Sequence, residues 1–218
     1  MWPGEWTIER RGRIARAFVF GLGILLGGCA TAPKDGVVTI QPASQQQSTH
    51  QVVGDAIVAS LGGATVTVRW LDENGVEQYF GTRPGLVYPW PKEVWKEAPP
   101  TIFLLQVRNQ TRDEVQFDPG LAAIVTQGGS RDRLIPYEDM YMRLAGEEGS
   151  GPRLVSLQAA LFSRFVVIAP GGQREGLLVF PVLDPEARHL LLELSSFFVG
   201  GRLTPGLFEF RVLRGKPE

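Results

Sequence analysis

The sequence is poor in the residues on which most metal, redox and nucleophilic sites depend. Its 218 residues include one cysteine, Cys29, and two histidines, His50 and His189. A single cysteine permits no intramolecular disulfide and excludes the usual zinc sites built from several cysteines. The 22 basic and 23 acidic side chains nearly balance, at a formal net charge of −1. A basic surface for nucleic acid is therefore not expected.

Long apolar runs are also scarce, and one near the N-terminus stands out. Residues 17–27 are almost wholly apolar and follow a segment rich in arginine. Their length fits the hydrophobic region of a secretory signal peptide, about 7–15 residues. A membrane-spanning helix needs about 20 residues, so this run is too short to span comfortably. The sequence therefore predicts a signal peptide over residues 1–28.

The apolar run ends in Leu26-Gly27-Gly28-Cys29, which resembles the lipobox of bacterial lipoproteins. That pattern is a leucine three positions before the cysteine, then two small residues, then the cysteine. A thiolate is the side-chain nucleophile suited to forming a thioether with diacylglycerol. The resemblance implies cleavage between Gly28 and Cys29, followed by attachment of diacylglycerol and an acyl chain to Cys29. No other cofactor is expected.

The resemblance also implies a location. In many Gram-negative lipoproteins, aspartate directly after the cysteine favours retention in the inner membrane. Ala30 occupies that position here, so we expect an outer-membrane anchor that faces the periplasm. Three acyl chains, at about 0.8 kcal/mol per buried CH₂, make such an anchor effectively permanent.

The segment after the cysteine is predicted to be a flexible tether. Residues 29–50 are rich in Pro, Gln, Ser and Thr and cannot supply a core. Within them, residues 37–40 form a short β-like patch that either stays free or adds a strand to a sheet edge.

Residues 51–218 are predicted to form a mainly β domain. Between residues 101 and 213, short apolar or alternating segments recur at about ten-residue spacing, separated by Gly/Pro turns. That arrangement is typical of an antiparallel β-sandwich. The segments FLLQVRNQTRDEVQF, VIAPGGQREGLLVF and FEFRVL resemble the immunoglobulin-like domains common in bacterial envelope lipoproteins. The cysteine pair of antibody domains is absent.

Two local patterns add detail to this domain. Asn74-Gly75 lies between two runs of extended character, so residues 64–80 are predicted to form an N-terminal β-hairpin. From Pro136, apolar residues recur at i, i+3, i+4, i+7 and i+8, which predicts a helix. A second helix is expected from Pro152. Residues 136–162 are therefore predicted to be a short helical insertion between strands.

No pattern predicts a catalytic or metal site. Four carboxylates lie near the expected helices: Glu138, Asp139, Glu147 and Glu148. No calcium-binding loop sequence accompanies them. An alternative function as an envelope hydrolase requires these carboxylates to line a deep pocket with His189 or an arginine. A solvated helix face is the simpler interpretation.

A proline-rich loop over residues 88–95 holds the aromatic residues Tyr88, Trp90 and Trp95. These side chains either form a platform for a glycan or a partner protein, or they close the open end of a sheet. A carbohydrate-binding module that uses this loop is thus a further alternative.

The sequence favours a non-enzymatic module, anchored by lipid in the cell envelope, that binds or assembles with another component. Its expected partners are the membrane, through the anchor, and another envelope protein or a glycan. The edges of a β-sandwich can accept an added strand from such a partner.

Overall fold

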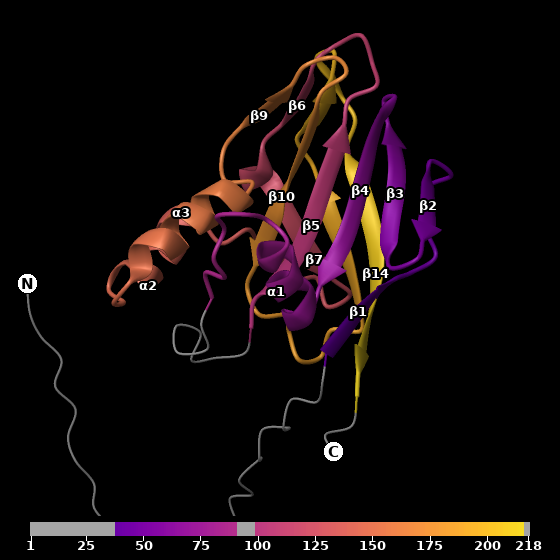
Figure 1. Ribbon diagram of the computed structural model, residues 1–218. Helices are drawn as coiled ribbons and strands as arrows, with labels where there is room; N and C mark the ends of the chain where they lie inside the picture. The colour runs from indigo at the N-terminus through magenta and orange to yellow at the C-terminus, as the bar shows by residue number, and fades with distance from the viewer. Residues whose placement is uncertain (1–37, 91–98, 216–218) are drawn as a thin grey trace, which may run out of the picture. The chain divides into compact units, whose positions relative to one another are not determined.

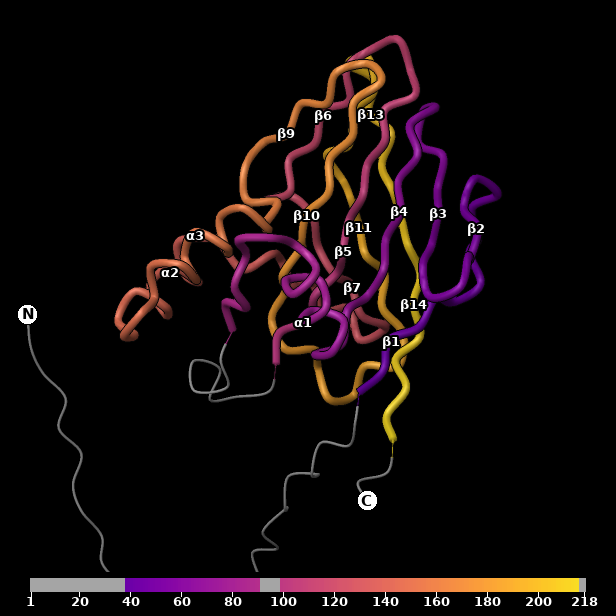
Figure 2. Tube along the Cα trace, in the orientation of Figure 1, coloured from indigo at the N-terminus to yellow at the C-terminus, as the bar shows by residue number. Residues whose placement is uncertain are grey.

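The computed structural model describes residues 38–90 and 99–215, all within the compact unit Lys34–Glu218. Strands are the main regular element among these residues, and they pair antiparallel in two five-stranded sheets and one four-stranded sheet (Figures 1 and 2). A continuous apolar core joins the two large sheets. The predicted mainly β, antiparallel sandwich with short helical parts is therefore confirmed.

Each sheet joins strands from distant parts of the chain. In spatial order, the first sheet consists of β1 (Val38–Pro42), β14 (Gly206–Arg214), β11 (His189–Leu194), β7 (Ala122–Thr126) and β8 (Arg131–Arg133). The second sheet consists of β10 (Gln173–Phe180), β5 (Thr101–Arg108), β4 (Ala64–Leu71), β3 (Ala56–Leu61) and β2 (His50–Val53). The third sheet consists of β13 (Arg202–Leu203), β12 (Phe197–Val199), β6 (Val115–Phe117) and β9 (Val166–Ile168). The helices are α1 (Glu73–Gly81), α2 (Tyr137–Ala145), α3 (Ser150–Ala160) and the short 3-10 helix η1 (Pro119–Leu121).

The main core lies between the first and second sheets and is built from alternate strand positions. The inward residues of β11 and β14 are those that the alternation predicts, and each is at most 3% exposed: Leu190, Leu192, Leu194, Phe208, Phe210 and Val212. From the second sheet, Phe103 lies with its ring centroid 5.0 Å from that of Phe210. Burial of each such side chain contributes about 1.5–3 kcal/mol.

An outer core lies on the opposite face of the second sheet, beneath the helices (Figure 1). Ile102 and Leu104 of β5, with Leu177 and Val179 of β10, belong to it together with buried residues of α1, α2 and α3. Both faces of β5 are buried along residues 102–105, and this stretch is an unbroken apolar run. The predicted helical insertion is confirmed as α2 and α3.

The predicted hairpin over residues 64–80 is wrong, because α1 takes the place of its second strand. Asp72 caps this helix, since its Oδ1 accepts a hydrogen bond from the backbone N–H of Gly75 at 2.7 Å. Three apolar side chains at helical spacing then pack against the sheet: Val76, Tyr79 and Phe80. Asn74-Gly75 therefore lies in the first turn of a helix rather than in a β-turn.

The hairpin that does form joins β3 to β4 one element earlier. Its turn is Gly62-Gly63, whose φ angles are 58° and 92°. A tight type I′ turn needs positive φ at both central positions, which glycine adopts without steric cost. The stretch directly before this turn is thus a strand, β3.

The fold also begins earlier than the predicted tether allows. β1 pairs with β14 along its whole length, and β2 starts within the same stretch. Between them, the Gln45 side chain donates to the backbone oxygen of Glu209 at 2.9 Å and accepts from its N–H at 3.2 Å. The prediction of a flexible tether over residues 29–50 is therefore wrong for residues 38–50. Residues 29–37 lie outside the described residues.

Candidate functional site

Several of the predicted site residues lie outside the part of the chain that the structure describes. These are the cleavage and lipidation residues Gly28 and Cys29, and Trp95 of the aromatic loop. Within residues 38–90 and 99–215, no helix has both the length and the apolar character needed to cross a bilayer.

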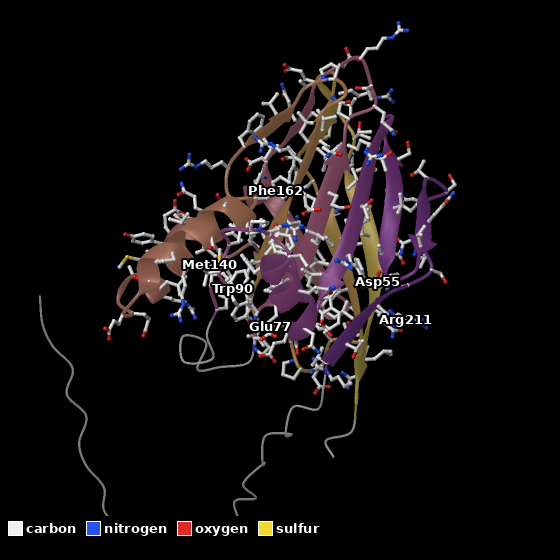
Figure 3. All side chains as sticks on the ribbon, in the orientation of Figure 1. Asp55, Glu77, Trp90, Met140, Phe162 and Arg211 are labelled. Atoms are coloured by element: carbon white, nitrogen blue, oxygen red, sulfur yellow. The ribbon has the colours of Figure 1, made fainter. Side chains whose placement is uncertain are left out.

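The aromatic loop closes the outer core. Trp90 is 3% exposed, and its ring centroid lies 5.7 Å from that of Phe80 and 6.2 Å from that of Tyr88. Figure 3 shows Trp90 near Met140 of α2, and both belong to this core. No face of the Trp90 ring is free, so the prediction that it contacts a glycan or partner is wrong. Tyr88 stays partly exposed.

Tyr88 lies at the edge of this cluster, and its surroundings shift the pKa of its hydroxyl. Burial raises the pKa of its hydroxyl, and the negative charges of Glu73 and Glu77 on α1 raise it further. The hydroxyl therefore stays protonated across the physiological range and acts as a neutral hydrogen-bonding group at the edge of the outer core.

The carboxylates of the helical insertion do not form a pocket with His189. The four predicted acids are all exposed: Glu138, Asp139, Glu147 and Glu148. His189 begins β11 of the first sheet, whereas α2 and α3 pack on the outer face of the second sheet. The sandwich therefore separates these carboxylates from His189. Among the described residues, no group of three or more His, Cys, Asp and Glu side chains is placed to hold a metal.

A hollow of about 630 Å³ lies on the outer face of the second sheet, beside the helix-covered part. We call it the polar trough, since every side chain that lines it from that face can form hydrogen bonds. Its lining side chains are Thr65 and Thr67 of β4, Gln106 and Arg108 of β5, and Gln173 and Glu175 of β10. Val107 and Arg174, also at its edge, lie opposite each other in the register and belong to the other face of the sheet, where Val107 is buried in the main core.

The strand register arranges most of these side chains in two rows. Thr67, Gln106 and Glu175 lie opposite one another across three strands. Thr65, Arg108 and Gln173 form the adjacent row in the same way. Neighbouring strands are about 4.8 Å apart, so each row spans about 10 Å.

The polar trough begins where the helical cover of the sheet ends. Along β5 the outward residues are first Ile102 and Leu104, in the outer core, and then Gln106 and Arg108. Antiparallel β10 shows the same change at the same level of the sheet. The change from apolar to polar outward residues can be seen in the sequence of each strand. These residues form a site only when three strands from separate parts of the chain lie side by side.

A hydrogen-bonded network fixes the wall of the trough nearest the helices. Arg83, just after α1, donates to one carboxylate oxygen of Glu175, and Gln106 donates to the other. The Arg83 guanidinium also donates to the backbone oxygen of Tyr79 at 2.7 Å and lies 3.6 Å from the centroid of that ring. The Glu175 charge is thus compensated and its side chain held in place.

One cation of the trough has no such compensation. Arg108 is exposed and makes no side-chain hydrogen bond or ion pair with another described residue. Since Glu175 is already paired, the trough presents net positive charge to a ligand.

A second hollow, of about 380 Å³, lies on the outer face of the first sheet. Aliphatic side chains form much of its floor, with Gln46 and Gln47 at one margin and His189 at another. Among the described residues, no group of unpaired charges gathers there, so it offers less directional chemistry than the polar trough.

The sequence matches no protein-family model and, at a significant level, no curated protein. Among solved structures, it is similar to the yjhA protein from Bacillus subtilis, with a TM-score of 0.36 and 12% sequence identity. The match covers 63% of this chain and 76% of that chain. A similarity of this size supports no statement about function.

Proposed function

We propose that this protein is a lipoprotein of the bacterial cell envelope, a non-enzymatic binding or assembly module held by lipid on the periplasmic side of the membrane. The observation that carries the proposal is the lipobox Leu26-Gly27-Gly28-Cys29, directly after a basic and an apolar segment. In this proposal Cys29 bears the diacylglycerol and acyl chains, and Ala30 directs the protein to the outer membrane.

The early start of the fold supports a module that works close to its membrane. Only residues 30–37 separate the lipidated cysteine from β1. The nine Cα–Cα steps from Cys29 to Val38 span at most about 30 Å when fully extended, whereas the 22 residues of the predicted tether would reach about 75 Å. The partner of such a module therefore lies at or near the surface that carries the anchor.

The chain enters the domain at one end of the sandwich, which leaves the opposite end available to a partner. Val38 lies opposite Arg214, so both ends of the described chain leave the first sheet at the same end (Figure 1). At the other end of β14, Gly206 lies against Leu61, next to the β3–β4 turn. The polar trough lies toward that turn, away from the end that receives the anchor.

The lipidation step is tested by replacing Cys29. Cells that express wild type or Cys29→Ser are fed an alkyne-labelled fatty acid, and their membranes are separated from soluble proteins. We expect label and a shortened chain in wild type, and neither in Cys29→Ser. Thr31→Ser, just outside the lipobox, is the matched control and should behave as wild type. An unlabelled wild-type chain of full mass that stays in the membrane would show that residues 17–27 are an uncleaved anchor.

The binding role is tested by crosslinking in native membranes followed by purification of the lipidated protein. We expect a defined envelope component to be recovered with the wild-type protein. Recovery of no component, together with measurable turnover of an envelope substrate, would contradict a non-enzymatic module.

A further inference from the structure

The chemistry of the polar trough restricts what it can bind. Its lining combines hydroxyl, carboxamide and guanidinium groups, without an exposed aliphatic or aromatic side chain. An apolar ligand would remove these groups from water and return no hydrogen bonds, at a cost of about 1–3 kcal/mol for each group. The matching ligand therefore carries hydrogen-bonding groups along its whole length, as a saccharide does.

The charge of the trough restricts the ligand further. Arg108 stands in the centre of its row, between Thr65 and Gln173, and has no acidic partner among the described residues. A guanidinium matches the planar geometry of a carboxylate and can donate two parallel hydrogen bonds to it.

The size and stiffness of the trough suit a small ligand. A volume of about 630 Å³ lies within the range of sites for small molecules, about 300–1,000 Å³. The Arg83–Glu175–Gln106 network holds one wall in place without a ligand, so less side-chain freedom is lost on binding.

From these observations we propose that the polar trough binds an acidic saccharide, whose carboxylate pairs with Arg108 and whose hydroxyls bond to the Thr65, Thr67 and Gln173 side chains. This proposal rests on the proposed function only for its location: the protein would bind the saccharide in the cell envelope. The side chains of the trough determine the binding itself.

The test uses the purified full chain in neutral detergent and isothermal titration calorimetry with trigalacturonate. We expect binding that weakens as sodium chloride is raised, and that is lost for the methyl ester of the same trisaccharide. Arg108→Gln should weaken binding at least about ten-fold, because one charge-assisted pair is removed. Thr67→Val, nearly equal in shape, should weaken it by a smaller factor.

The matched control is Arg211→Gln, which removes an exposed strand arginine from the first sheet (Figure 3). It should bind trigalacturonate as wild type does. Equal loss in Arg211→Gln and Arg108→Gln, or equal binding of the acid and its methyl ester, would overturn the proposal. Tighter binding of triglutamate would assign the trough to acidic peptides and also overturn it.

The two proposals fail separately. Binding of trigalacturonate by a chain that cells do not label with lipid would contradict the anchor alone. Lipid labelling of a chain that binds none of the three probes would contradict the saccharide site alone.

Discussion

The main core and the outer core bury similar side chains but are enclosed in different ways. The main core lies between two sheets, whose strands hold each other by continuous backbone hydrogen bonds. The outer core lies between one sheet and a cover made of α1, α2 and α3 with Tyr88 and Trp90. We expect the main core to be lost only with the whole fold, and the outer core to open locally at lower free energy.

One buried hydroxyl links two parts of the cover. Ser156 of α3 is fully buried; its hydroxyl accepts from the backbone N–H of Val87 at 2.7 Å and donates to the oxygen of Pro152 at 2.9 Å. This hydroxyl joins α3 to the backbone directly before the aromatic loop. The second sheet therefore contributes side chains to both cores, and we expect α1, α2 and α3 to be the part that opens locally.

The largest expected effect is in the main core. Phe103 is completely buried, against the rings of Phe180 and Phe210. Phe103→Ala should lower the free energy of unfolding by about 3–5 kcal/mol, because it leaves a cavity that the two sheets cannot close. Urea denaturation followed by circular dichroism measures this. A loss below about 1 kcal/mol would show that the sheets do not pack as described.

The same truncation in the outer core should act locally. Phe80 is 1% exposed, between Tyr79 and Trp90. We expect Phe80→Ala to cost about 3 kcal/mol, at the low end for a buried phenylalanine, because the cover can settle into the space. Hydrogen exchange should show lost protection in α1, α2 and α3, while β11 and β14 stay protected. Uniform loss across all strands would contradict a separable outer core.

At the end of the second sheet without helical cover, Asn109 should matter for hydrogen bonding rather than for packing. It is 1% exposed; its amide donates to the oxygens of Asp113 and Ile168, and its oxygen accepts two bonds from Thr111. Asn109→Ala should lower the free energy of unfolding, measured in urea, by about 2 kcal/mol, since these buried partners lose their hydrogen bonds. The exposed Asn74 is the control, and Asn74→Ala should have little effect.

A smaller effect is expected at the start of α1. Asp72→Ala removes the capping carboxylate and should cost about 1 kcal/mol, with a loss of helical signal in circular dichroism. An unchanged helical signal and unchanged stability would contradict the assignment of residues 73–81 to a capped helix.

The smallest effect concerns pH. His50 is 6% exposed, packed 5.0 Å from the Phe208 ring centroid, and burial lowers its pKa, against the opposing charge of Glu209. The unfolded chain then takes up a proton before the folded one, so stability should fall as pH drops below about 6.5. His50→Gln should flatten this dependence and His189→Gln, at an exposed site, should leave it unchanged. A fall of the same slope in His50→Gln would assign it to other groups.

The sequence predicts the main core well, because its strands alternate wherever the outer face meets solvent, as in β11 and β14. It predicts α2, whose apolar positions follow the helical period. It does not predict α1: Asp72 and Gly75 suit both a tight turn and a helix cap, and contact with the sheet decides between them. β1 is likewise decided by a distant edge, that of β14.

The candidate site is harder to predict. The aromatic side chains of residues 88–95 attract attention because of their chemistry, yet Trp90 serves the outer core. The polar trough is made of outward residues of three strands, such as Thr67 and Gln106, and only the strand register places them side by side. No local pattern in the sequence predicts that register.

The central claim, a lipid-anchored module, is tested most directly by the intact mass and N-terminal fragments of the protein purified from membranes of its own cells. The account predicts a chain that begins at Cys29 and carries diacylglycerol and an acyl chain there. A chain that begins at Met1, with an unmodified Cys29, would contradict it.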